Sequence, residues 1–159
     1  MRSYLSSDFK EDDYTPTVLD VYKGRKNVDS FSLDVEIHDT SGDENLSVNR
    51  HIQYNDTDLF VLCVAVDLRA SFKNVKRWVS EIKQARPDAP IALILTKRDL
   101  AEIVEDPVTI DQLKEQGKEF GCEIIKETSS KEYSDFNVMY TFDECLMSAF
   151  HTKYLNHSQ

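Results

Sequence analysis

The sequence has few of the residues that interrupt or cross-link a chain: its 159 residues include 4 glycines, 4 prolines and 3 cysteines. Such low glycine and proline contents exclude collagen-like and low-complexity chains. Cys63, Cys122 and Cys145 are too few and too scattered for a disulfide framework, so we expect them to be reduced and buried. There is no apolar run of ~18 residues, and the first residues have no signal-peptide core.

Positive charge is also scarce: the sequence has 19 Lys and Arg residues and 29 Asp and Glu residues, for a net charge of −10. A nucleic-acid-binding surface needs a basic stripe, and an anionic membrane surface attracts a basic patch, so the sequence predicts neither partner. The last residues contain no prenylation cysteine and no polybasic segment. We therefore expect a cytoplasmic protein without a lipid anchor in this chain.

Apolar patterning predicts the strands. Residues 31–38 alternate, with Phe31, Leu33, Val35 and Ile37 on one face, which is typical of a half-buried strand. A turn at residues 29–30 would pair it in antiparallel fashion with residues 17–28. The uninterrupted apolar runs 59–67 and 90–96 are typical of strands covered on both faces.

Segments with helical spacing of apolar residues lie between or after these strands. Residues 71–85 place Phe72, Val75, Trp78 or Val79, and Ile82 on one face. A second helix is expected from about Thr109 to Phe120, then a strand at 122–127 and a last helix whose apolar stripe comprises Met139, Phe142, Leu146, Phe150 and Tyr154. The order predicts an α/β, doubly wound, mostly parallel sheet with one antiparallel edge strand.

Polar clusters follow three of the predicted strands: "DTSGDE" at 39–44, "TKRD" at 96–99 and "ETSSK" at 127–131. The carboxyl ends of strands in such a sheet form its ligand site. Asp39 could hold Mg²⁺ directly or through water, and the Gly42 N–H could approach a terminal phosphate. The Asp99 carboxylate could accept hydrogen bonds from N1 and N2 of guanine, a pair that adenine does not offer.

In combination these motifs resemble the small GTPases, and within them the Rho/Rac branch. The matching segments are "DDYTPTV", "DTSGDE", "YNDTDLFVLCVAVD", "SFKNVKRW", "TKRDL" and "ETSSK". The Thr in "TKRDL", where most small GTPases have Asn, together with "YNDTD" and "PDAPI", favours Rho/Rac. The resemblance covers roughly residues 3–154, so we expect a GTPase domain at 1–155 and a short tail at 156–159.

The resemblance implies GTP or GDP and Mg²⁺ as cofactors, and protein effectors and regulators as partners. Thr17 and Asp39 would be metal-binding, and Gly42 would sense the γ-phosphate through its N–H. The implied nucleotide-binding residues are Thr96, Lys97, Asp99, Ser129, Ser130 and Lys131, with Phe9 packing against the base. The implied switch and effector surface comprises Tyr14, Pro16, Thr17, Val18 and Asp20.

The sequence departs from the family in three places. It contains no GxxxxGKS/T phosphate loop and no preceding strand, which favours a truncated domain. Losing about six charge-assisted contacts removes on the order of 10 kcal/mol, so we expect impaired nucleotide binding. Asp43 stands where the family has the catalytic Gln, which predicts slow hydrolysis. Only residues 101–108 separate Leu100 from the next helix, too few for the extra helix of the Rho branch.

The absent strand would lie in the middle of the family's sheet, between the strands ending at Asp39 and Asp67. Its loss leaves two rows of backbone donors and acceptors, so we expect that the two strands close up, that a partner fills the slot, or that the protein folds poorly. Two functional hypotheses stay open at this point. The chain is either a Rho-like switch with weak nucleotide binding, or a non-catalytic pseudo-GTPase interaction domain that uses the switch surface.

Overall fold

The structure is a computed structural model that describes residues 17–28, 30–122, 124–131 and 138–155. The strands are β1 (Leu19–Val28), β2 (Phe31–Thr40), β3 (Phe60–Ala65), β4 (Ile91–Thr96) and β5 (Ile124–Glu127). The α-helices are α2 (Ser47–Tyr54), α3 (Arg69–Ala85), α4 (Ile110–Phe120) and α5 (Val138–Phe150). Short helices η1 (Glu44–Leu46), η2 (Arg98–Leu100) and η3 (His151–Leu155) complete the described elements.

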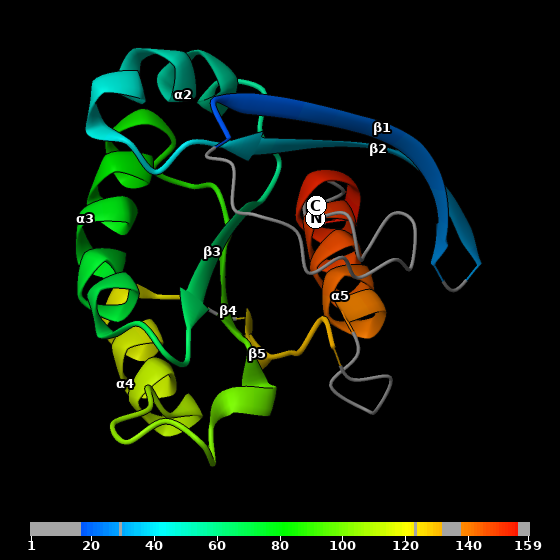
Figure 1. The fold of residues 1–159 in the computed structure, drawn as a ribbon. Coiled ribbons are helices and arrows are strands. Elements are labelled where there is room, and N and C mark those ends of the chain that lie inside the picture. Colours follow the sequence, from blue (N-terminus) through cyan, green and yellow to red (C-terminus); the bar gives the residue numbers. More distant parts are fainter. Residues whose placement is uncertain (1–16, 29, 123, 132–137, 156–159) are drawn as a thin grey trace.

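A parallel sheet with the strand order β3–β4–β5 forms the centre of the molecule. In Figure 1, α3 and α4 lie on one side of this sheet and α5 lies on the other. Residues Ile91–Leu95 are all buried because β4 is the central strand and has helices over both faces. Leu93 and Leu95 belong to the core under α3 and α4, whereas Ala92 and Ile94 pack with Cys145 of α5.

The hairpin β1–β2 forms a second, two-stranded sheet. Its antiparallel register runs from Leu19 opposite Thr40 to Val28 opposite Phe31, and the predicted pairing is confirmed. Figure 1 shows the hairpin arching past α5, apart from β3. The α/β class is confirmed, and the described strands divide between two sheets that share no ladder. The strands expected to flank the absent central strand have not closed up.

The helix predictions hold for α3 and α4. Val75, Val79 and Ile82 are the buried residues of α3, so Val79 rather than Trp78 enters the core. Thr109 begins α4 with a capping box, in which its side chain accepts from the Gln112 N–H. Gly121 ends the helix at φ 69°, a left-handed conformation that glycine adopts without a steric penalty. Between η2 and α4 the chain forms turns and no helix, as the length of residues 101–108 predicted.

The predicted stripe of α5 needs correction. Val138, Thr141 and Cys145 are its buried residues, and Tyr154 is 56% exposed. The C-terminal end of the stripe faces the hairpin instead of the parallel sheet, because the Phe150 ring packs against the Phe31 ring with centroids 4.6 Å apart. The sequence pattern could not include this contact with a separate sheet.

One cysteine also departs from its prediction. Cys122 and Cys145 are buried as expected, whereas Cys63 is exposed. Cys63 lies on β3, an edge strand of the three-stranded sheet, where the covering of the strand is incomplete. The apolar run at 59–67 therefore overstated the burial of β3. No helix in the described ranges is long and apolar enough to cross a membrane.

Candidate functional site

The ends of β3 and β4 form one corner of the candidate site. The Thr96 hydroxyl donates to the Val64 carbonyl at 3.2 Å, which joins the two strands at their carboxyl ends. Lys97 follows in the left-handed conformation, with φ 59°. Its ammonium lies 2.8 Å from a carboxylate oxygen of Asp67, so the lysine stem spans the gap between the loops after β3 and β4. These contacts place Lys97 at the edge of the sheet where the ligand was expected.

Asp99 and Ser129 are brought together from two different loops. The Ser129 hydroxyl donates to Oδ1 of Asp99 at 2.6 Å, and only 1% of Ser129 is exposed. The Lys131 N–H donates to the same hydroxyl oxygen at 3.1 Å. Because the Ser129 hydroxyl donates to Asp99 and also accepts from the Lys131 N–H, its position is fixed, and it fixes the orientation of the Asp99 carboxylate.

Backbone hydrogen bonds hold these two loops at the sheet edge. The Thr128 N–H donates to the Leu95 carbonyl at 2.8 Å, and the Arg98 N–H donates to the Thr128 carbonyl at 3.1 Å. The predicted residues Thr96, Lys97, Asp99 and Ser129 therefore share one corner, with exposed Ser130 and Lys131 in the adjoining loop. We call these six residues the base corner. A carboxylate oxygen accepts more than one hydrogen bond, so Asp99 can serve Ser129 and a ligand together.

Asp39 lies at the other end of the candidate site, near the end of β2. Asp20 of β1 is its cross-strand neighbour. Burial raises the pKa of the Asp39 carboxyl above its ordinary value, and the charge of Asp20 raises it further. A half-buried carboxylate next to a second one fits the expected Mg²⁺ ligand, because a divalent cation would offset both effects.

The other metal-binding prediction, Thr17, is half-buried just before β1. The Ser41 N–H donates to the Val18 carbonyl at 3.3 Å, so the segment that includes Thr17 runs beside the loop that follows Asp39. Within the described ranges there is no group of three or more His, Cys, Asp or Glu residues that could hold a metal ion. This finding does not conflict with a magnesium site, since Mg²⁺ bound with phosphate takes only one or two carboxylates.

Residues 41–46 overlap the segment "DTSGDE" (39–44), which the resemblance matches to the second switch of the small GTPases, and we call them the second-switch loop. The loop contains Gly42 and Asp43, the residues expected to act on the γ-phosphate and the attacking water. The Asp43 carboxylate accepts from the Asn45 N–H at 2.9 Å and from the Asn45 amide at 3.0 Å. It thus satisfies donors at the beginning of η1. Gly42 is exposed, and a Cβ built on it would lie 4.0 Å from the Trp78 ring. The loop therefore rests beside α3, with the Asp43 carboxylate engaged inside the loop.

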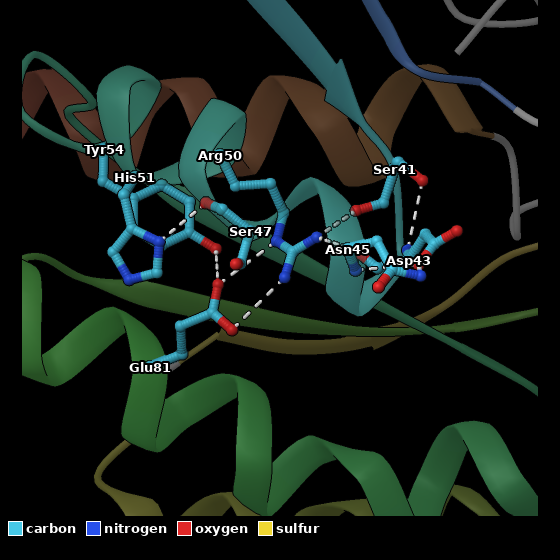
Figure 2. Close-up of polar contacts among 8 residues, drawn as sticks. All are labelled: Ser41, Asp43, Asn45, Ser47, Arg50, His51, Tyr54 and Glu81. Carbon is cyan, nitrogen blue, oxygen red and sulfur yellow. Dashed lines mark hydrogen bonds and ion pairs between the residues drawn. The ribbon is translucent and has the colours of Figure 1, made fainter.

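Arg50 of α2 is a residue that sequence reasoning missed. Only 3% of it is exposed, and its guanidinium donates to the carbonyls of Ser41 at 2.9 Å and Asp43 at 2.5 Å. The same group pairs with Glu81 of α3 at 3.2 Å (Figure 2). No local sequence pattern indicates that Arg50 is buried and binds these groups, because an arginine on an amphipathic helix is ordinarily placed in solvent.

Glu81 and Tyr54 complete this polar cluster. The Tyr54 hydroxyl donates to Glu81 at 2.9 Å, and burial together with that hydrogen bond raises the pKa of Tyr54 to about 12. Burial opposes the ionisation of Glu81, but the hydrogen bonds donated by Arg50 and Tyr54 outweigh it, so the pKa of Glu81 lies below its ordinary value. The carboxylate is therefore charged at neutral pH and balances the buried guanidinium.

Several predicted residues are not placed. Phe9, Tyr14 and Pro16 lie outside the described residues. Val18 is 58% exposed and Asp20 is also exposed, and their role in a partner surface stays a prediction.

The comparison with known families agrees with this geometry. A sequence model of the Ras family matches residues 1–150. The chain belongs to the Ras family. Proteins of this family generally bind guanine nucleotides with Mg²⁺ and act in signalling through effectors and regulators. In this Ras-family chain the base corner holds its carboxylate fixed from both loops, and Asp39 supplies a carboxylate suited to a cation.

We expect Ser129→Ala to lower the free energy of unfolding by about 1–2 kcal/mol, because it removes a buried hydrogen bond to a carboxylate. Urea denaturation of this Ras-family chain measures the change. Ser130→Ala is the matched control, since Ser130 is exposed and should change stability by less than ~0.5 kcal/mol. Equal effects of the two variants would show that the Asp99–Ser129 contact does not hold the corner.

Asp39→Asn should stabilise the protein at neutral pH. The folded chain binds the Asp39 proton more tightly than the unfolded chain, because the pKa is raised from its ordinary value of 3.8. Stability therefore falls as the pH rises from that value through the raised pKa, and the asparagine variant lacks this loss. Thermal melts between about pH 4 and about pH 8 should show a Tm gain on the order of 2 °C, confined to the upper part of the range.

Asp34→Asn is the control for this measurement. Asp34 is a strand carboxylate whose side chain is 80% exposed and pairs with Arg25. An exposed ion pair of this kind contributes little to the free energy of unfolding, so the Tm of Asp34→Asn should differ from that of the unmodified protein by less than about 1 °C. A lower Tm for Asp39→Asn at neutral pH would contradict the assigned electrostatic cost of Asp39.

Proposed function

We propose that this Ras-family chain is a Rho-like small GTPase domain that recognises the guanine base through Asp99 and binds the nucleotide weakly. The observation that supports this most strongly is the 2.6 Å hydrogen bond from buried Ser129 to Asp99. It orients the acceptor through a contact within the protein. Preorganisation of this kind lowers the cost of ordering on binding.

Base selectivity follows from the chemistry of this acceptor. A carboxylate accepts hydrogen bonds from both N1 and N2 of guanine, whereas adenine would leave it without these donors. Lys97 can lay its methylene stem over the base plane while its ammonium stays with Asp67. The domain should therefore prefer guanine nucleotides over adenine nucleotides even where total affinity is low.

Affinity should be limited on the phosphate side. The 159 residues contain no GxxxxGKS/T loop, whose backbone N–H groups and lysine supply most phosphate contacts in proteins that have it. A loss on the order of 10 kcal/mol takes a site of about −12 kcal/mol, which is nanomolar, to millimolar affinity or weaker. Thr17 and Asp39 would hold Mg²⁺, which neutralises charge on phosphate oxygens when bound.

Hydrolysis should be slow for an additional reason. Asp43 occupies the position at which the family's glutamine orients the attacking water. Its carboxylate is one methylene shorter than glutamine, adds negative charge near a polyanion, and already accepts two hydrogen bonds from Asn45. The Rho-like assignment is supported by Thr96 in "TKRDL" and by "YNDTD", whereas the short segment 101–108 departs from that branch.

A second candidate function is a non-catalytic interaction domain. It is favoured by Val48 and Ile52, which are 70% and 63% exposed and lie four residues apart on α2, next to the second-switch loop. Residues at this spacing share one helix face. Protein partners would use this face whether or not a nucleotide is bound.

Titration with fluorescent GDP and ADP analogues in the presence of Mg²⁺ separates the two functions. We expect GDP to half-saturate only above about 100 μM, and to bind at least ~10-fold more tightly than ADP. Asp99→Asn should remove the preference, while Asp34→Asn, at an exposed carboxylate outside the base corner, keeps it. Saturation by GDP below about 10 μM would contradict the affinity argument. Absence of any preference for GDP over ADP would contradict the proposed function and favour the second candidate, the non-catalytic interaction domain.

A further inference from the structure

Arg50 of α2 connects its own helix to two other parts of the chain. Its guanidinium donates to two carbonyls of the second-switch loop, those of Ser41 and Asp43, and to the carboxylate of Glu81 on α3. Arginine can do this because its donors form a rigid planar fork, which lysine lacks. The loop, α2 and α3 are thus joined at one buried group.

The anchor on α3 is itself fixed. The Glu81 side chain is 17% exposed and accepts from the Tyr54 hydroxyl as well as from Arg50. Arg50 also lies 4.8 Å from the centre of the Trp78 ring, a favourable position for a cation over an aromatic face. Because Arg50 and Glu81 are little exposed, solvent screens their charges less, and their electrostatic attraction is stronger than that of an ion pair on the surface.

Inside the second-switch loop, polar groups are satisfied by the protein itself. The Asp43 N–H donates to the Ser41 hydroxyl at 3.1 Å, and the Leu46 N–H donates to the Asp43 carbonyl at 3.2 Å. The Asp43 carboxylate accepts from Asn45 (Figure 2). With the Arg50 contacts added, the loop is held by groups of the protein itself.

We propose that Arg50 is a positioning residue that, with Glu81, holds the second-switch loop on α3, so that the loop keeps one conformation whether GDP or GTP is offered. Two discrete loop states with different ligand affinities are what a nucleotide switch needs. The Arg50–Glu81 pair favours one of them through contacts that involve no nucleotide. The part of this proposal that concerns nucleotide response rests on the proposed function.

Amide hydrogen exchange of the full 159-residue chain without nucleotide tests the positioning role. In the unmodified protein, residues 41–46 should be protected, and Arg50→Lys should speed their exchange at least ~10-fold, since local opening sets these rates. Glu81→Gln is a second variant that weakens the same anchor with a smaller effect. Equal exchange of residues 41–46 in the unmodified and Arg50→Lys proteins would overturn the proposal.

Arg69→Lys is the matched control. Arg69 also forks to a carboxylate and a loop carbonyl, those of Asp106 and Pro107, on a different side of α3. Its variant should speed exchange at residues 102–108 and leave residues 41–46 unchanged. Exchange of the β4 amides reports global unfolding. If Arg50→Lys also speeds exchange in β4, the test uses Glu81→Gln instead. Unchanged protection of residues 41–46 in Glu81→Gln would then overturn the proposal.

The nucleotide arm repeats the exchange with GDP and a non-hydrolysable GTP analogue, each at about 5 mM with Mg²⁺, a concentration within the expected millimolar range of dissociation constants. Protection of residues 41–46 should agree within about twofold between the two nucleotides in the unmodified protein. Greater protection with the GTP analogue would overturn the proposal. Absence of guanine-dependent protection at residues 96–99 and 128–131 would instead contradict the proposed function, while the Arg50→Lys result still decides the positioning role.

Discussion

The buried guanidinium of Arg50 joins parts of the chain that no described β-ladder connects. The β1–β2 hairpin and the β3–β4–β5 sheet are separate, and the loop that leaves β2 meets α3 through Arg50 and Glu81. A buried cation is tolerated only when it is paired and hydrogen-bonded, and removal of one partner leaves the others unsatisfied. This requirement fixes the second-switch loop beside α3.

The base corner is built differently. Its geometry follows from the parallel register of β4 and β5, which brings the loops after both strands to one edge. The Thr128–Leu95 and Arg98–Thr128 backbone bonds then set the distance between Asp99 and Ser129. The two halves of the candidate site therefore have independent supports, one in the sheet and one in a side-chain cluster. Because the supports are separate, the proposed base recognition does not depend on the Arg50 cluster.

Sequence periodicity was sufficient for the strands and for α3 and α4, because buried strands and amphipathic helices leave regular apolar patterns. The polar clusters after β4 and β5 correctly indicated that Asp99 and Ser129 meet at one edge of the sheet. The binding role of these residues stays a prediction. Sequence periodicity failed where a contact depends on distant segments. Tyr154 and Cys63 had been predicted to be buried, but the first extends beyond the Phe31–Phe150 contact and the second lies on an edge strand. The Arg50 cluster was missed because its partners are up to 31 residues apart and no motif links them.

We propose that this Ras-family chain has a preformed, guanine-specific base corner. Chemical-shift mapping of the ¹⁵N-labelled protein with GMP and with AMP, each at about 5 mM, tests it most directly because neither ligand depends on a β- or γ-phosphate site. The account predicts that GMP shifts the amides of residues 96–99 and 128–131, that AMP does not, and that Asp99→Asn abolishes the response. Equal shifts with both nucleotides, or GMP shifts that avoid these residues, would contradict it.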